Sequence, residues 1–199
     1  MSERTGRVMW CVLMCVVVAT AALAQEAPEM TAEQEAMMKA WQEAMTPGPQ
    51  HAHMAEMVGE FKITVKTYNG PDAEPEVMTG TASRRMIMGG RYLEETVHSS
   101  YMGQPFEGRS VTGFNNVTGT WWGTWIDNMS TGIMTSHGEW NEDTGVGVFY
   151  GEYVDPMTKE IQETRTVVKQ LEGGDELMES YMTTPTGEFK SMDILYERQ

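Results

Sequence analysis

The segment Phe61-Lys62-Ile63-Thr64-Val65-Lys66 alternates between apolar and polar side chains without interruption. A period of two is that of a β-strand with one dry face and one solvated face. The same alternation recurs from Gly59 to the end of the chain, interrupted by turn-forming pairs such as Gly89-Gly90 and Asn115-Asn116. Residues 59–199 are therefore predicted to form one all-β domain.

About ten strands are expected in this domain, joined by short links. The expected strands are Phe61–Lys66, Val77–Met88, Tyr92–Tyr101, Phe106–Phe114, Thr118–Asp127, Gly132–Trp140, Val146–Val154, Ile161–Leu171, Glu176–Thr183 and Phe189–Tyr196. Short links make neighbours in sequence neighbours in space, which is typical of an antiparallel meander. An open sheet of this size leaves two exposed edges. We therefore expect closure into a barrel, with a two-sheet sandwich as the alternative.

The first 24 residues have the pattern of a secretory signal peptide. Arg4 and Arg7 precede the apolar stretch Val8–Ala21, which is shorter than the ~20 residues that a transmembrane helix needs. Small residues then lead to an expected cleavage site between Ala24 and Gln25. We expect a protein that is exported to the periplasm or the extracellular space, without a stable membrane anchor.

Charge and cysteine content narrow the classes of function. The chain of 199 residues has 29 acidic and 14 basic side chains, and its formal net charge is −15. Such an acidic surface argues against nucleic-acid binding, which requires Lys and Arg at the phosphates. Cys11 and Cys15 both lie in the expected leader, so the mature protein has neither a disulfide nor a cysteine nucleophile.

Residues 25–58 read as an N-terminal extension that contains a short helix. Thr31 and Gln34 have the spacing of a capping box. Apolar residues follow at helical spacing, namely Met37, Met38, Trp41 and Met45. Proline and glycine residues at 47–49 end this run, and a second helical turn is expected at His51–Val58.

Methionine is unusually abundant, with 19 residues in the chain. Its flexible thioether suits it to fill a core in place of leucine. The segment from His51 to Met57 also contains soft ligands that suit copper(I), but its two histidines would not share one helical face. We therefore predict no metal site and no cofactor.

The most distinctive segment runs from Gly113 to Gly138 and contains Trp121-Trp122-Gly123-Thr124-Trp125-Ile126-Asp127. Together with Val58-Gly59-Glu60-Phe61 and Met88-Gly89-Gly90-Arg91-Tyr92-Leu93, it resembles a bacterial, largely exported family known as domain of unknown function 1579. The likeness extends from about residue 51 to residue 198. It implies a lipocalin-like barrel with a Gly-x-aromatic start, and it supplies no catalytic residue.

Aromatic side chains on the strands are the candidates for ligand contacts. Trp121 and Trp125 share one face of an expected strand, and Trp122 lies on the other. Whichever face points inward, an indole enters the barrel, where it either fills the core or stacks against a bound molecule. We predict a protein that binds a small apolar or amphipathic molecule through Trp121, Trp125, His137, Tyr150, Arg165 and Tyr181.

Two alternatives to a ligand-binding protein are open. An enzyme on the same barrel, a hydrolase or isomerase, would use Asp127, His137 or Glu163. The common hydrolase and nucleotide-binding motifs are absent, so no catalytic residue is assigned. A protein-interaction or homo-oligomerising module would instead present an outward patch of Trp and Met to an envelope protein or a second copy.

Overall fold

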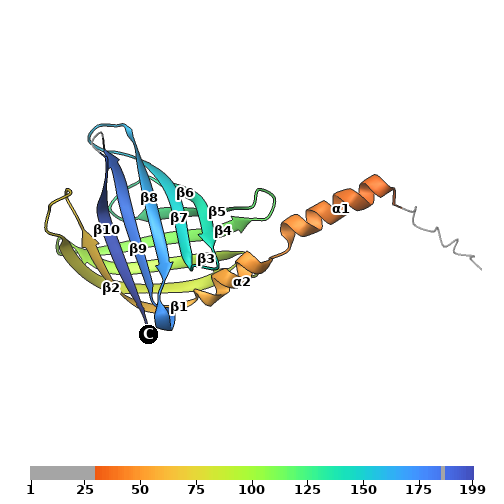
Figure 1. The fold of residues 1–199 in the computed structure, drawn as a ribbon, viewed down its shortest axis with the longest axis horizontal. Helices are drawn as coiled ribbons and strands as arrows, with labels where there is room; N and C mark the ends of the chain where they lie inside the picture. The colour runs from red at the N-terminus through yellow and green to blue at the C-terminus, as the bar shows by residue number, and fades with distance from the viewer. Residues whose placement is uncertain (1–29, 185–186) are drawn as a thin grey trace, which may run out of the picture.

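Ten antiparallel strands close into a barrel in the computed structural model, which describes residues 30–184 and 187–199 (Figure 1). The strands are β1 (Gly59–Thr67), β2 (Glu76–Ile87), β3 (Tyr92–Tyr101), β4 (Gln104–Asn115), β5 (Thr120–Asp127), β6 (Met134–Asn141), β7 (Val146–Val154), β8 (Ile161–Gln170), β9 (Glu176–Thr184) and β10 (Gly187–Arg198). A 3₁₀ turn, η1 (Glu172–Gly174), lies between β8 and β9. The expected signal peptide falls outside the described residues.

Each strand pairs with its neighbours in sequence, and β1 pairs with β10 to complete the ring. The closing register runs from Phe61 opposite Arg198 to Thr67 opposite Met192. The predicted all-β meander and its closure are therefore confirmed, and the sandwich alternative is excluded. Closure gives each of the ten described strands a partner on both sides.

The starts of β1, β4, β5, β6 and β10 each differ by two residues from the predicted starts, and the shift of β6 has a local cause. β6 begins at Met134 rather than at Gly132, because the chain leaving β5 is held in a turn. The Asp127 carboxylate accepts hydrogen bonds from the backbone N–H groups of Met129 and Ser130, at 2.9 and 3.0 Å. Backbone that bonds to a side chain in this way is withdrawn from the strand ladder.

From residue 30 onward, two helices precede the barrel, α1 (Ala32–Met45) and α2 (Pro49–Glu56). The predicted capping box is present: the Gln34 N–H donates to Thr31 Oγ1 at 3.3 Å, and the Thr31 N–H donates to Gln34 Oε1 at 2.8 Å. α1 projects away from the barrel and has no buried residue, whereas α2 lies at one end of the barrel (Figure 1). Among the described residues, no helix has the length and apolar character to cross a membrane.

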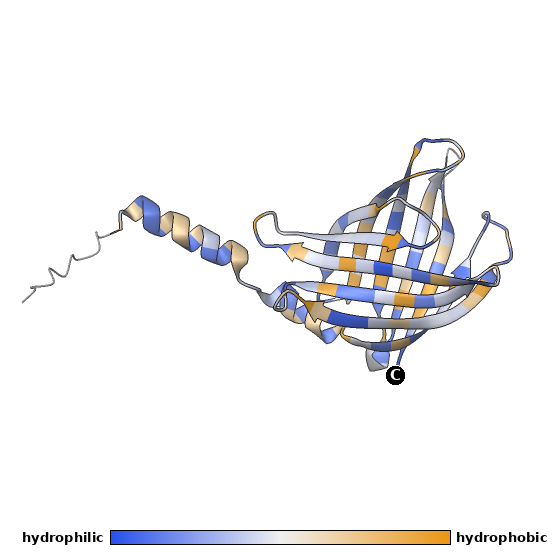
Figure 2. Cartoon of the chain, turned by 180° about the vertical axis from the view of Figure 1, so that it is seen from behind, coloured by the Kyte–Doolittle hydropathy of each residue, from blue (hydrophilic) through white to orange (hydrophobic). Residues whose placement is uncertain are grey.

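The period of two separates an inner from an outer face, and hydrophobic and hydrophilic bands alternate along the strands in Figure 2. On β1 the inward residues Phe61, Ile63 and Val65 are buried. They pack with Ala82, Val97, Ile194 and Tyr196 in a core formed by β1, β2, β3 and β10. The hydrophobic core therefore occupies one wall of the barrel.

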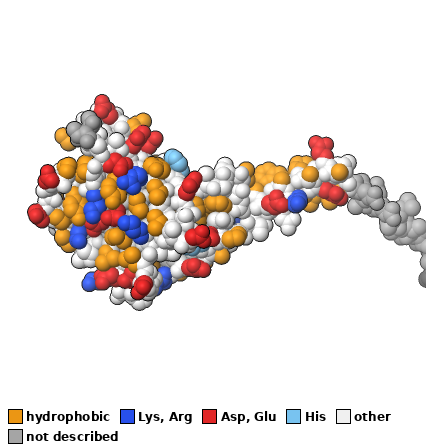
Figure 3. All heavy atoms as spheres, viewed as in Figure 1, with side chains coloured by type: hydrophobic (Ala, Val, Ile, Leu, Met, Phe, Trp, Pro, Cys, Tyr) orange, Lys and Arg blue, Asp and Glu red, His pale blue; other side chains and the backbone are white. Residues whose placement is uncertain are grey.

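The outer face carries pairs of opposite charge. On β8–β10, the Lys169 and Lys190 ammonium groups lie 2.7 and 3.4 Å from the Glu179 carboxylate. Hydrogen bonds from Lys169 and Lys190 hold the pKa of Glu179 below its ordinary value. Cationic and anionic side chains stand close together on this face in Figure 3, so it offers no uniform patch of either sign.

Candidate functional site

α2 closes one end of the barrel, which we call the floor. Met54, at the inner face of the helix, is 0% exposed and packs on Leu93 and Trp121. The His53 ring lies 4.8 Å from the Trp140 ring, centroid to centroid. Partly buried side chains complete the floor, namely Met57, Met86, Phe114, Trp140 and Phe149.

Polar side chains from the turns at the floor hold the N-terminal helices. Asn116 Nδ2 donates to the carbonyl oxygens of Glu43 and Thr46, at 3.0 and 2.8 Å. Arg91 Nη2 donates to the carbonyl oxygen of Met45 at 2.8 Å. Carbonyl groups at the C-terminal end of a helix lack partners within it, so these contacts satisfy groups that would otherwise face solvent alone.

Small side chains line the middle of the barrel. The strand registers place the following residues on the inner face: Gly108, Ser110, Thr112, Gly123, Ser136, Gly151, Thr164, Thr166 and Ser180. Ser110, Thr112, Ser136, Thr164 and Thr166 remain partly exposed although they point inward. The interior, which we call the lumen, is therefore not filled by its own side chains along these strands.

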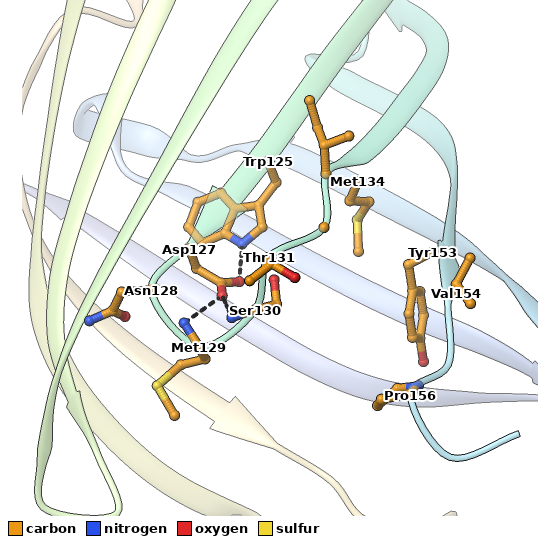
Figure 4. Close-up of a pocket in the computed structure, with 12 residues that line it drawn as sticks. Trp125, Asp127, Asn128, Met129, Ser130, Thr131, Met134, Tyr153, Val154 and Pro156 are labelled. Atoms are coloured by element: carbon orange, nitrogen blue, oxygen red, sulfur yellow. Dashed lines mark hydrogen bonds between the residues drawn. The ribbon is translucent and has the colours of Figure 1, made fainter. Parts of the chain in front are cut away.

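A cavity of about 730 Å³ lies at the opposite end, which we call the mouth (Figure 4). It lies between the end of β5, the loop that leads to β6, and the end of β7. Its lining residues are Trp125, Asp127, Asn128, Met129, Ser130, Thr131, Gly132, Ile133, Met134, Tyr153, Val154 and Pro156. This volume is in the range that holds a small organic molecule.

Trp125 forms one wall of the cavity and is held in place from three sides. Its indole Nε1 donates to Asp127 Oδ2 at 2.9 Å (Figure 4). Its ring stacks against Phe106 with a centroid distance of 6.3 Å and an interplanar angle of 20°. Behind it, Gly108 leaves room for the ring, since a Cβ there would lie 2.2 Å from Trp125 Cζ2.

The loop after β5 is fixed to the barrel rim by Asn128. Its Oδ1 accepts the N–H of Glu107 at 3.1 Å, and its Nδ2 donates to the carbonyl oxygen of Pro105 at 3.0 Å. Together with the turn around Asp127, these bonds give the loop a defined shape without burying it. The mouth is thus formed by backbone that side-chain hydrogen bonds preorganise.

Tyr153 lies on the other side of the cavity from Trp125 (Figure 4). Its hydroxyl lies 3.9 Å from the sulfur of Met182, the inward residue of β9 near the mouth. Burial, together with the nearby Asp155 carboxylate, raises the pKa of the Tyr153 hydroxyl, so this group is a neutral donor at ordinary pH. The cavity therefore combines two aromatic rings, the thioethers of Met129 and Met134, and a phenol hydroxyl.

A buried charge cluster lies below the cavity, toward the floor. Arg84 donates to Glu95 through Nε, and to both oxygens of Glu176 at 2.9 and 3.2 Å. Its guanidinium carbon lies 4.9 and 4.4 Å from the ring centroids of Phe61 and Tyr196. All three charged residues are buried, with 6–8% of each residue exposed. Burial lowers the pKa of Arg84, but the attraction of Glu95 and Glu176 outweighs it and raises that pKa.

Sequence reasoning missed this cluster, although a signal was present. Glu95 lies between Leu93 and Val97, and Arg84 lies two residues after Ala82, so both charges share the parity of an apolar face. A charge on the dry face of a strand requires a buried partner. Alternation alone did not identify that partner, because Glu176 comes from a distant strand.

The six predicted ligand contacts divide between the two faces of the sheet. Trp125 points inward and lines the cavity, and Trp121 points inward but is buried under α2 in the floor. The other four, His137, Tyr150, Arg165 and Tyr181, are successive partners in register across β6–β9 on the outer face. They are brought together, but outside the lumen. There the Arg165 guanidinium carbon lies 4.3 Å from the Tyr181 ring centroid.

The residues considered for an enzyme do not converge. Asp127 is on the inner face at the mouth, whereas His137 and Glu163 are on the outer face. The Asp127 carboxylate already accepts hydrogen bonds from Trp125 and two backbone N–H groups. A general base requires an orienting partner and a reachable proton in one cleft. This set of residues therefore forms no catalytic constellation.

No group of three or more His, Cys, Asp or Glu side chains in the described part of the chain is arranged to hold a metal ion. The two histidines of α2 have structural surroundings. His51 Nδ1 accepts the N–H of Gly48 at 3.0 Å and thereby caps the helix. Burial and the nearby Arg91 charge lower the pKa of His51, which keeps its imidazole neutral for that role.

Residues 46–198 match the model of the family described as protein of unknown function (DUF1579). The matched region contains α2 and the barrel from β1 to the last residue of β10. A search of curated proteins finds no match. The family description names no activity, so the chemistry of the site is argued from the geometry of the barrel.

Proposed function

We propose that this chain, which belongs to the DUF1579 family, binds a small apolar or amphipathic molecule in the lumen of its barrel. The single observation that supports this proposal is the cavity of about 730 Å³ at the mouth, next to partly exposed inward side chains. A molecule that enters there meets the faces of Trp125 and Tyr153 and the thioethers of Met129 and Met134. Such a surface binds by apolar contact and adapts to shape.

The cellular location of the protein is part of the same proposal. The leader at residues 1–24 directs the chain across the inner membrane, and the mature protein acts in the periplasm or outside the cell. Mass spectrometry of the protein purified from its own host would locate the N-terminus. A mature chain that begins at Gln25 supports export, and an intact Met1 contradicts it.

The ligand proposal is tested with N-phenyl-1-naphthylamine, a neutral probe that becomes fluorescent in apolar surroundings. We expect saturable binding that Trp125→Ala weakens about tenfold, since the loss of a stacked ring of this size costs about 1.4 kcal/mol. Trp122→Ala is the matched control, because Trp122 lies on the outer face of the same strand. Circular dichroism confirms that both variants fold. Absence of binding, or equal effects of the two variants, would contradict the proposal.

α1 supports a second candidate function, self-association. Its residues Met37, Met38, Trp41 and Met45 are each more than half exposed and form one stripe along the helix. Lys39 and Glu43 lie away from this stripe and Glu33 and Glu35 flank its N-terminal end, so two copies can bury their stripes against each other. Light scattering after size exclusion tests this. A dimer that Trp41→Glu converts to a monomer supports it, and a monomeric wild type contradicts it.

A further inference from the structure

The charges around the lumen restrict the class of molecule that fits it. Of the twelve described residues that line the mouth cavity, one is acidic, Asp127, and none is Lys, Arg or His. Lys159 belongs to the loop between β7 and β8, where it follows the Asp155 turn, and it is not part of the lining. The wall that a ligand touches therefore carries two aromatic rings, two thioethers and one negative charge, and its other residues are uncharged.

The arginines on the inner face are not available to an anion. Arg84 is bound by both Glu95 and Glu176, so the buried cluster has two carboxylates for one guanidinium. Arg198 lies at the floor, where it donates to the carbonyl oxygens of Val58 and Glu56. The registers of the described strands place the other cationic side chains of the sheet on the outer face: Lys62, Lys66, Arg85, Arg109, Arg165, Lys169 and Lys190.

Transfer of an anion into this space is unfavourable for two reasons. The anion loses its hydration without gaining a cationic partner. It also approaches the Asp127 carboxylate in surroundings where charges interact more strongly than in water. A cation is favoured in both respects, because it approaches a carboxylate and lies against the faces of Trp125 and Tyr153.

We infer that the lumen accepts neutral and cationic amphipathic molecules and rejects anionic ones, such as fatty acids and anionic phospholipids. The inference rests on the proposed function, since it concerns the class of ligand for the same cavity. The ligand is then a neutral lipid-like or aromatic molecule, or an amine whose ammonium group lies at the mouth beside Asp127.

The test compares two surfactants with the same alkyl chain, used below their micelle concentrations. Dodecyltrimethylammonium and dodecyl sulfate each compete with N-phenyl-1-naphthylamine for the purified protein. We expect the ammonium compound to displace the probe at a concentration at least about tenfold lower than the sulfate. Binding of 8-anilino-1-naphthalenesulfonate, which adds a sulfonate to the body of the neutral probe, is expected to be weaker by a similar factor.

Two variants distinguish the effect of the Asp127 charge on ligand preference from the effect of the net charge of −15. Asp127→Asn removes the carboxylate in the cavity and keeps an acceptor for Trp125, and we expect it to reduce the cation preference at least about threefold. Glu163→Gln removes one carboxylate from the outer face and should leave the preference unchanged. Equal effects of the two variants overturn the inference.

The possible failures are distinguishable. If the neutral probe does not bind, the proposed function itself fails. If the probe binds and both surfactants displace it equally, or the sulfate does so better, the lumen binds ligands but this charge selection is wrong. Urea unfolding shows that Asp127→Asn is folded, and the comparison of the two surfactants on the wild type does not depend on that variant.

Discussion

The guanidinium carbon of Arg198, near the C-terminus, lies 5.0 Å from the ring centroid of Phe61, near the start of the barrel. Its nitrogens donate to the carbonyl oxygens of Val58 and Glu56, at 2.8 and 3.0 Å. Gly59 leaves room for this contact, because a Cβ there would lie 2.6 Å from Arg198 Nη1. The Gly-x-aromatic start is thus explained by one arginine that joins the closing strand to the end of α2.

Arg198→Lys should destabilise the protein by about 2 kcal/mol. Lysine keeps the charge but cannot place two planar donors on both carbonyl oxygens and stack on Phe61. Urea unfolding followed by circular dichroism measures the change. Arg109→Lys is the control, because Arg109 is an exposed residue that pairs with Glu107 on the surface, and its effect should stay below about 0.5 kcal/mol. Equal losses in the two variants would contradict a special role for Arg198.

Arg84→Met should destabilise the fold by about 3 kcal/mol or more at neutral pH. It leaves Glu95 and Glu176 buried without their cation. Two such carboxylates repel each other, and the folded variant binds protons more readily than the unfolded chain. The deficit of the variant, which is its loss in free energy of unfolding relative to the wild type, should therefore become smaller as the pH falls toward about 5.

Arg85→Met is the matched control for Arg84→Met, since the neighbouring side chain is 72% exposed and pairs with Glu94 on the outer face. Its effect in the same urea unfolding series should be small at every pH. A deficit of Arg84→Met that grows on acidification would show that the cluster does not depend on its buried arginine.

The lowered pKa of His51 predicts a loss of stability in mild acid. Its pKa is lowered from the ordinary 6.5 by burial and by Arg91, so the unfolded chain takes up a proton that the folded chain resists. The free energy of unfolding therefore falls as the pH drops below about 6.5. In His51→Gln, which retains an acceptor for the Gly48 N–H, this component is absent.

Urea midpoints at about pH 7.5 and about pH 5.5 test the role of His51. We expect the midpoint of the wild type to fall more on acidification than that of His51→Gln. His137→Gln, on the exposed outer face, serves as the control and should respond to pH as the wild type does. An identical response of wild type and His51→Gln would refute this assignment.

Gly108→Ala should displace Trp125 and narrow the mouth. A Cβ at 2.2 Å from the indole forces the ring to move, at a cost of about 1–3 kcal/mol in stability. Tryptophan fluorescence and the affinity for N-phenyl-1-naphthylamine should both change. Gly132→Ala lines the same cavity but has no atom within 4 Å of the added Cβ, so it should change neither. Unaltered fluorescence in Gly108→Ala would show that the indole is not held there.

The succession of strands was predictable from the sequence because burial of one sheet face imposes a local period of two. Phe61, Ile63 and Val65 show that period within one strand, and glycine- and asparagine-rich turns set off the others. The capping box of Thr31 and Gln34 was also predictable from local sequence, because its hydrogen bonds join residues three apart. Local chemistry therefore determined the elements, and short links determined their order.

Only the tertiary structure decided which face of each strand points inward and which distant residues meet. Alternation in one strand separates two faces but does not say which of them points inward. The structure places His137, Tyr150, Arg165 and Tyr181 in one row on the outer face and Trp125 in the mouth. Closure brought Glu176 to Arg84, and α2 covered the floor but not the mouth. These outcomes depend on side-chain volume and charge summed around the whole ring, which no single segment of sequence contains.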